Sequence, residues 1–188
     1  MDASRAWPDV ADFVAGALLR SLDGERVIAY LQCTRPTSAS DLASAGLIPR
    51  LDAVAGATDS LTYAVMTLEA PPQVSPSALV IAPDDGLTTL INVFETDPSR
   101  QQELLETWIT VGEPFTHHPG FVSAALHRST DGTRVVNYAH WRSAADWQDL
   151  VAEHGRDFGR FRRLGQSDPH LYDVVHLVEE ARRAPQQV

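Results

Sequence analysis

The sequence predicts an α+β protein that contains two copies of one unit, of which the first copy is truncated. Three observations lead to this prediction. Residues 13–31 and 121–139 are related by an offset of 108 positions and are identical at 11 of 19 positions. A shorter echo relates residues 62–68 to residues 171–177 in the same chain order. Strand-like and helix-like patterns alternate over residues 87–178, as expected for a mixed fold.

The second unit begins with a predicted strand and helix. Residues 87–95 are apolar and rich in β-branched side chains, which favours a strand. Asp97 and Pro98 then supply a helix cap and a first-turn proline. Residues 121–128 and 134–141 predict two strands joined by a turn that contains Asp131 and Gly132, a strong hairpin signal.

A second helix and a last strand complete this unit. Ser143 is the predicted helix cap, with Asp146 as its capping-box partner, and the apolar face holds Trp147, Leu150 and Val151. The last strand covers residues 171–178. The order βαββαβ is that of the ferredoxin-like fold, which leaves one face of its sheet uncovered. A second copy can cover that face. We therefore predict two ferredoxin-like repeats that form a pseudo-dimeric α+β barrel.

The first unit, residues 1–70, is predicted to be a degenerate copy. Twelve residues precede Phe13, which leaves no room for a first strand and helix. Strands at 13–21, 26–33 and 61–69 and a helical stretch within 38–55 remain. Residues 71–86 predict a Pro-rich linker with a short extra strand at 78–82, which either replaces the missing first strand or crosses to another subunit. Residues 87–180 are the complete unit, and residues 181–188 are a tail.

Composition limits the classes of partner. The chain has 25 acidic and 15 basic residues and a formal net charge of −10, so it should repel a phosphate backbone. No apolar run approaches the length of a membrane span, and the first residues are acidic where a signal peptide is basic. We expect a cytoplasmic protein that binds neither nucleic acid nor membrane. The single cysteine, Cys33, excludes a disulfide within the chain and is expected to be a small buried hydrophobe.

Two polar side chains lie four residues apart on one predicted strand. Asn137 and Trp141 share a face because side chains alternate along a strand, whereas Tyr138 and His140 point to the other face. Polar groups among apolar neighbours indicate one of two arrangements. They line a small-molecule pocket, or they are a hydrogen-bonded core asparagine and a tryptophan that packs beside it. His140 is expected at the contact with the other unit or another subunit.

Residues 119–143, PGFVSAALHRSTDGTRVVNYAHWRS, resemble the antibiotic-biosynthesis monooxygenase family, and residues 89–108 resemble its opening strand and helix. The resemblance covers residues 87–178. It implies a pocket between the sheet and the helices. In the quinone-forming members of this family, small dimeric enzymes oxidise aromatic polyketides with oxygen and use no metal, heme or flavin. Other members degrade heme.

The resemblance also implies a set of site residues. The asparagine and tryptophan of the family's NYAxW motif correspond to Asn137 and Trp141, which would be the catalytic pair. Trp147 stands where the quinone-forming members have a pocket tyrosine, so the ring is kept and the phenolic hydroxyl is lost. A family arginine falls near Arg160. Asn92, on the opening strand, occupies a region where heme-degrading relatives place an asparagine.

Several histidines are further candidates. His127 and His176 lie on predicted strands, where either could bind the substrate, act as a general base or pack. His117 and His118 form an adjacent pair that suggests either a metal ligand or a cation at a helix end. His154 lies near the helix on which heme-degrading relatives carry their iron ligand. We predict no metal and no cofactor.

The expected function is that of a cofactor-independent oxygenase that converts an aromatic polyketide-type anthrone or phenol to a quinone. Its partners would be the aromatic substrate and O2, and a homodimer is one expected assembly. The first unit has Ala29 and Cys33 in place of the asparagine and tryptophan, so that copy is expected to be structural. One alternative is a non-catalytic ligand-binding or assembly module of the same fold. A lesser alternative is a heme-degrading monooxygenase.

Overall fold

The computed structural model describes residues 7, 10–45, 59, 61–72 and 86–179. These residues form one antiparallel sheet of seven strands in the order β2-β1-β7-β4-β6-β5-β3. The strands are β1 (Phe13–Ser21), β2 (Val27–Cys33), β3 (Tyr63–Glu69), β4 (Thr88–Thr96), β5 (Phe121–Ser129), β6 (Arg134–Trp141) and β7 (Gly165–Glu179). The helices are α1 (Ala39–Ser44), α3 (Gln101–Gly112) and α4 (Ala144–His154), with 3-10 helices η2 (Glu113–His117) and η3 (Asp157–Arg163).

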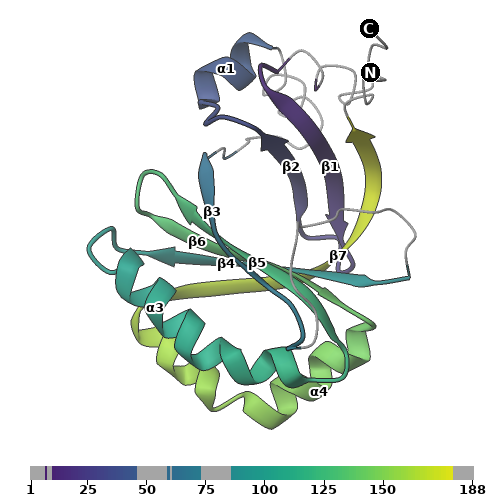
Figure 1. The fold of residues 1–188 in the computed structure, drawn as a ribbon, viewed down its shortest axis with the longest axis vertical. Coiled ribbons are helices and arrows are strands. Elements are labelled where there is room, and N and C mark those ends of the chain that lie inside the picture. Colours follow the sequence, from purple (N-terminus) through teal and green to yellow (C-terminus); the bar gives the residue numbers. More distant parts are fainter. Residues whose placement is uncertain (1–6, 8–9, 46–58, 60, 73–85, 180–188) are drawn as a thin grey trace, which may run out of the picture.

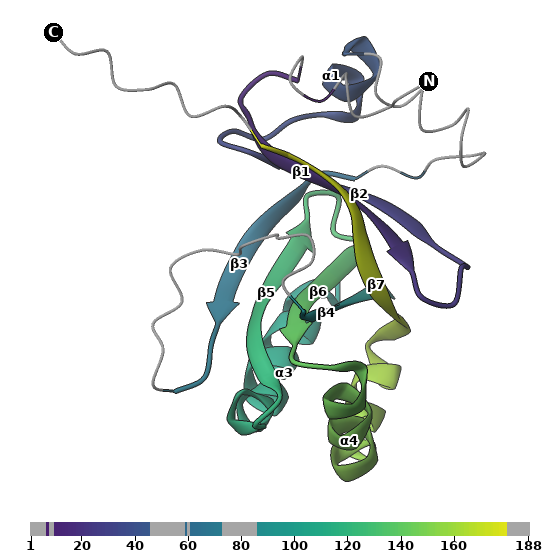
Figure 2. The same ribbon diagram turned by 90° about the vertical axis from the view of Figure 1, so that its right-hand side faces the viewer.

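The second half has the predicted βαββαβ order. Its strands lie in the sequence β7-β4-β6-β5 within the sheet, which is the ferredoxin-like arrangement. Helices α3 and α4 lie side by side on one face of these four strands (Figures 1 and 2). Leu104, Leu105 and Trp108 of α3 and Leu150 of α4 bury their side chains against that face.

The long strand β7 joins the two halves of the sheet. Its first part pairs with β4, and its second part pairs with β1 of the first half. Tyr172 stands at the change of partner, because it lies opposite Thr89 on one side and Ser21 on the other. Figure 1 shows β7 running from the layer above α3 and α4 to the β1–β2 hairpin.

The two halves use the same pairing register. The pairing of β3 with β5 matches the pairing of the second part of β7 with β1, residue for residue. Both pairings contain one irregularity, and it lies at the equivalent position. An offset of 109 relates β3 to β7, and an offset of 108 relates β1 to β5. The matching pairs are Tyr63–Ser129 and Tyr172–Ser21 at one end, and Glu69–Ala124 and Val178–Gly16 at the other. The predicted α+β fold class is confirmed, and the matching registers support the prediction of two related repeats.

The two hairpin turns have the same hydrogen-bond network. In the first, Ser21 donates its hydroxyl to Asp23, and the N–H of Arg26 donates to the Ser21 hydroxyl. Ser129, Asp131 and Arg134 repeat this pattern in the second hairpin. The glycines that follow the two aspartates have φ of 78° and 84°, a left-handed conformation that favours glycine. The shared Ser-x-Asp-Gly-x-Arg sequence therefore encodes one turn geometry.

The sheet curls around a second apolar core. Tyr30 of β2 packs against Tyr138 of β6 with ring centroids 5.2 Å apart, although the two strands are not neighbours in the sheet. Its hydroxyl lies 2.8 Å from Nε2 of His127 on β5. Strands β2 and β3 are the two edges of the sheet among the described residues, so the sheet is a curled half-barrel.

The outer face of the first half is covered by Trp7 and α1. Trp7, Val10 and Phe13 form a buried cluster, against which Ala29, Leu31, Cys33, Leu42 and Val178 pack. Gly16 of β1 lies under the indole, where a Cβ would come within 2.5 Å of a Trp7 ring carbon. Helix α1 begins at a capping box made by Ser38 and Asp41, the counterpart of the Ser143 cap of α4. Cys33 is a free thiol and is only partly buried.

Four local predictions were wrong. The last strand begins at Gly165, six residues before its predicted start, and Cys33 is only partly buried. Helix α3 begins at Gln101 instead of after Asp97, because the Asp97 carboxylate accepts hydrogen bonds from the N–H and hydroxyl of Ser99 and forms a separate turn. Val151 is 37% exposed and does not share the buried face of α4 with Leu150. The predicted strand at 78–82, the tail at 181–188 and residues 46–55 lie outside the described residues.

None of the described helices is long and apolar enough to cross a membrane.

Replacement of Gly120 should test the contact between β5 and α4. A Cβ on buried Gly120 would collide with the Cβ and Cγ atoms of Asp146, a capping residue of α4. Gly120→Ala is therefore expected to lower the free energy of unfolding by about 1–3 kcal/mol, the usual cost of overpacking. Gly159→Ala is the matched control, because a Cβ at Gly159 would have no heavy atom within 4 Å. Equal urea midpoints for the two variants would contradict the prediction.

A pH-dependent contact ties the first hairpin to β7. His170 lies 2.7 Å from a carboxylate oxygen of Asp23 and 3.0 Å from one of Asp168. Burial alone would lower the pKa of His170, but these two hydrogen bonds outweigh it and raise the pKa. A raised histidine pKa stabilises the fold below the unfolded value of about 6.5, and the effect is lost as pH rises through the folded value. His170→Gln should therefore lower the urea midpoint at pH 5.5 more than at pH 9, and an equal loss at both would contradict this.

Candidate active site

A small hollow lies between the sheet and the helices of the second half. Its volume is about 20 Å³, about enough for one ordered water molecule. Strands β3, β5 and β6 form its floor, and α3, η2 and α4 form its roof. Its lining residues are Glu69, Trp108, Gly112, Phe115, Phe121, Ala124, Asn137, Ala139, Trp141, Trp147 and Leu150.

Strand β6 places two of the predicted site residues in this lining. Asn137 and Trp141 face the helices together with Ala139, whereas Tyr138 faces the core inside the curl. Both side chains are buried, with exposed fractions of 4% and 2%. The alternation of side chains along β6 thus gives the face that the sequence predicted.

Aromatic rings hold Trp141 in position. Its ring centroid lies 5.5 Å from Phe121 and 5.5 Å from Trp147, and 5.6 Å from the ring of His118. The Ser143 cap fixes the start of α4, and Trp147 lies on the first turn after it. Trp147 is half-buried, so its ring lines the hollow and also reaches the surface.

Three buried polar atoms belong to residues that line the hollow and lack a hydrogen-bond partner among the described residues. They are Nε1 of Trp108, Oδ1 of Asn137 and Nε1 of Trp141. Buried polar groups are rarely left unpaired, because each costs about 1–3 kcal/mol. Two of the atoms are donors and one is an acceptor. The hollow therefore suits a ligand that carries both an acceptor oxygen and a donor hydroxyl.

Glu69 is the ionisable side chain of this lining. It is the last residue of β3 and lies opposite Ala124 of β5, so the first half of the chain supplies it. Burial raises the pKa of the Glu69 carboxyl above its ordinary value. A carboxyl with a raised pKa at a pocket of aromatic residues is a candidate acid or base.

Asn92 is close to the site but has its own partner. It lies opposite Asn137 in the pairing of β4 with β6, so the two side chains share a face of the sheet. Its Oδ1 accepts a hydrogen bond of 3.0 Å from the hydroxyl of Ser167, and it does not line the hollow. Its predicted role in substrate binding stays a prediction.

Two predicted histidines lie elsewhere. His127 faces the core inside the curl, where Nδ1 lies 3.3 Å from the carbonyl oxygen of Val136 and Nε2 lies beside the Tyr30 hydroxyl. Burial lowers the pKa of His127 below its ordinary value, which favours the neutral ring. His176 is exposed on β7, with its ring 6.2 Å from that of Trp7. Neither residue lines the hollow.

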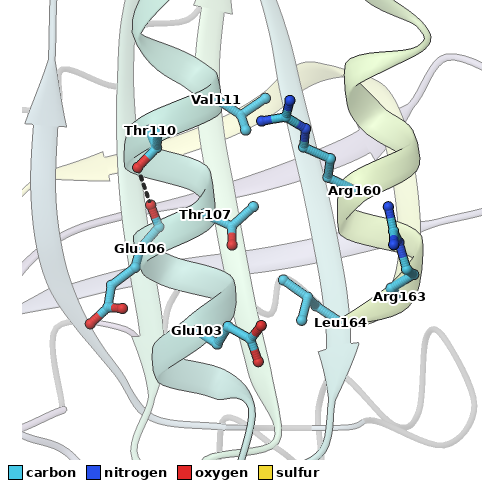
Figure 3. A pocket seen from close by; sticks show the side chains of 8 residues that line it. All are labelled: Glu103, Glu106, Thr107, Thr110, Val111, Arg160, Arg163 and Leu164. Atoms are coloured by element: carbon cyan, nitrogen blue, oxygen red, sulfur yellow. Dashed lines mark hydrogen bonds between the residues drawn. The ribbon is translucent and has the colours of Figure 1, made fainter.

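Arg160 lies in a separate groove between α3 and η3. Figure 3 shows Arg160 and Arg163 on η3, across from Glu103 and Thr107 on α3. This groove has a volume of about 410 Å³ and is wide open to solvent. Its charged side chains are exposed and remain hydrated. They therefore need no ligand to compensate for a loss of hydration. We therefore place the candidate active site in the small hollow and not in the larger groove.

The histidines weighed as metal or iron ligands do not gather at the hollow. His118 accepts the N–H of Gly120, and His117 is exposed beside Glu113. His154 packs its ring against Phe115 and lies 3.4 Å from a carboxylate oxygen of Asp157. Among the described residues, the acidic and histidine side chains close enough to share a metal ion are Asp23, Glu25 and His170, all in the first hairpin region or its contact with β7.

Sequence reasoning missed two residues of the site. Trp108 has helical spacing with Leu104 and Val111, which predicts a core position and gives no sign that the residue lines a hollow. Glu69 gives even less signal, because its place depends on the pairing of β3 with a strand some sixty residues away. A polar residue at the end of an otherwise apolar strand was the available sign.

Comparisons with known proteins identify relatives of the chain. The family model described as antibiotic biosynthesis monooxygenase matches residues 88–158. Tetracenomycin-F1 monooxygenase of Streptomyces glaucescens is 41% identical over 99 residues, which span 51% of this chain and 88% of that protein.

Two solved structures have the same fold over nearly the whole chain. An anthrone oxidase-like protein superposes with a TM-score of 0.72 and 16% identity, over 98% of this chain and 88% of its own. A candidate monooxygenase of Fusobacterium nucleatum gives a TM-score of 0.61 and 8% identity, over 95% and 85%. At these identities the two structures support the fold, and the Streptomyces relative supports the family. The chain belongs to the antibiotic biosynthesis monooxygenase family.

Proposed function

We propose that the chain is a cofactor-independent oxygenase that oxidises an aromatic polyketide-type anthrone or phenol to a quinone. The observation that carries this proposal is the set of three unpartnered polar atoms, on Trp108, Asn137 and Trp141, in the lining of one aromatic hollow. The similarity to tetracenomycin-F1 monooxygenase supports the same class of substrate.

The chemistry of the lining fits a flat hydroxy-ketone. The two indole N–H groups can donate to a carbonyl or peroxide oxygen, and Oδ1 of Asn137 can accept from a phenolic hydroxyl. Phe115, Phe121 and Trp147 provide rings against which a flat substrate can pack. Donors fixed in a site that excludes water stabilise an oxyanion more strongly than donors in solution.

The reaction needs little from the protein besides positioning. Removal of a proton from the methylene carbon of an anthrone leaves an electron-rich carbanion, which can reduce O2 directly. The carbanion and O2 form a peroxide, which is protonated and then loses water to give the quinone. One oxygen atom of O2 enters the quinone and the other leaves as water. Trp108 and Trp141 would stabilise the negative charge as it moves to oxygen.

The size of the hollow sets a condition on this proposal. Pockets for ligands of drug size usually measure about 300–1,000 Å³, whereas the hollow has room for about 20 Å³. A tricyclic ring can enter only if side chains of the roof move. Trp147 is the best placed of these, because it is half-buried on α4 and closes the outer side of the hollow.

The same observation favours a second candidate function. A hollow that holds about one water molecule also suits a non-catalytic module, in which the site is filled by its own side chains. The two candidates differ in a measurable way, because only the oxygenase must admit a flat ring.

Ligand entry should be visible in tryptophan fluorescence. Binding of anthraquinone, a flat product analogue, is expected to quench the emission of Trp108, Trp141 and Trp147 in a saturable way. Trp147→Phe should reduce the quenching by roughly a third, since one of the three quenched rings is removed. Trp7→Phe is the control, because Trp7 lies in a separate cluster. A wild-type protein with no saturable quenching would favour the non-catalytic module.

Oxygen uptake with anthrone or a dihydroquinone tests the catalytic roles. Asn137→Ala and Trp141→Phe should each lower kcat by about 10²-fold, the usual cost of one donor in an oxyanion site. Trp141→Phe removes the N–H and keeps an aromatic ring. Trp7→Phe is the matched control, because it removes an indole N–H in a separate cluster, and it should change kcat much less. Equal turnover by wild type, Asn137→Ala and Trp141→Phe would remove the proposed roles.

A further inference from the structure

Glu69 has an unusual position for a glutamate. It is the one ionisable side chain among the residues that line the hollow, and its neighbours there are apolar or aromatic apart from Asn137. Strand β3 brings it to this place, because Glu69 lies opposite Ala124 and directly opposite residues share a face of the sheet. Glu69 is partly buried there, and a carboxylate that loses part of its water costs free energy unless it has a partner.

The chain contains an internal comparison for this residue. The counterpart of Glu69 in the other half is Val178, which lies opposite Gly16 as Glu69 lies opposite Ala124. Val178 packs against the cluster of Trp7, where the indole covers the face that corresponds to the hollow. That covered face also has Ala29 and Cys33 in place of Asn137 and Trp141. The carboxyl is thus present beside the face that carries the hollow and absent beside the face that Trp7 covers.

Charged and titratable groups on the surrounding elements do not face the hollow. On β5, His127 points into the curl, and on α3 and η2 the carboxyl groups are exposed. On α4, the Asp146 carboxylate accepts the hydroxyl of its cap and His154 lies beside Asp157. The remaining groups on the strands are Tyr63, Arg128, Arg134, Tyr138 and His140, and none of them lines the hollow. The remaining groups on the helices, with His118 just after η2, are Glu103, Glu106, Glu113, His117, His118, Asp149 and Glu153, and none of these lines it either. Burial is accordingly the cause that raises the pKa of Glu69.

We propose that Glu69 is the general base of the oxygenase, supplied to the site of the second half by the first half of the chain. The proposal rests on the proposed function. The carboxylate takes a proton from the methylene carbon of the anthrone, and the electron pair of the broken C–H bond stays on the substrate. That carbanion reduces O2 and forms a C–O bond to give the peroxide anion. The proton held by Glu69 then passes to the peroxide oxygen, and loss of water gives the quinone.

Geometry and acidity agree in this role. A general base works best when its pKa lies near the working pH, and burial moves the Glu69 carboxyl in that direction. The indole N–H groups of Trp108 and Trp141 can hold the oxygen on which charge develops, while the carboxylate takes the proton from carbon. The proposal gives a function to the β3–β5 pairing, because that pairing is what brings the base to the donors.

Glu69→Gln tests the proposal, with Glu113→Gln as the matched control on exposed η2. The mutation should lower kcat for anthrone by about 10²-fold or more, the usual contribution of a general base, with KM changed by less than about threefold. The rate of wild type and of Glu113→Gln should fall at low pH as Glu69 is protonated, and this acidic limb should be absent in Glu69→Gln. Anthrone deuterated at its methylene carbon should slow the wild type.

A smaller variant provides a second measurement. Glu69→Ala leaves space for an external carboxylate, and added formate should restore part of its turnover in a concentration-dependent way. Formate should not help Glu69→Gln, in which the amide fills the space. Circular dichroism and the urea midpoint establish that each variant is folded, and Glu69→Asp, which keeps a carboxyl, should retain the acidic limb that Glu69→Gln lacks.

Each outcome has a definite meaning. An active wild type with equal kcat and the same acidic limb in Glu69→Gln would overturn the role of Glu69 and leave the proposed function standing. A wild type that takes up no oxygen with anthrone or dihydroquinones would overturn both. A loss of activity in Glu69→Ala that formate does not restore, together with an unchanged pH profile in Glu69→Gln, would show a packing role and overturn the proposal.

Discussion

The pairing of β7 with both β4 and β1 is the constraint on which the rest of the molecule depends. A strand of fifteen residues extends beyond the second half and becomes a strand of the first. Strand β3 does the same in the opposite direction when it pairs with β5. Each half therefore completes the sheet of the other. Helices α3 and α4 of the second half cover the candidate active site. Glu69, from the first half, is nevertheless one of the residues that line it.

This exchange explains how much of the site could be predicted. The period of two along residues 134–141 is a local property, so it placed Asn137 and Trp141 on the helix side and Tyr138 on the other side. The position of Glu69 depends on a contact between residues far apart in the sequence, for which a strand pattern gives no register. Trp108 satisfied the helical pattern of the core and was not distinguished from a packing residue.

The fold was predicted more fully than its details. The repeated Ser-x-Asp-Gly turn and the βαββαβ order indicated the class and most strand ranges, since both signals are short in range. The start of α3 could not be predicted, because Asp97 has two local hydrogen-bonding options and forms the turn with Ser99. The position of Arg160 depended on the path of the chain after α4, where a 3-10 helix turns it toward α3.

The indole of Trp7 has a consequence for how many ligands one molecule can bind. It lies on the face of the first half that matches the hollow, with Gly16 leaving room for its ring. An assembly of two identical chains with this architecture would have two equivalent chambers and could show communication between them. Here the matching face is already covered by a ring of the polypeptide, so the described part of the chain offers one such hollow for the proposed ligand. A binding curve for such a single site is a simple hyperbola, because no second bound ligand changes the affinity for the first.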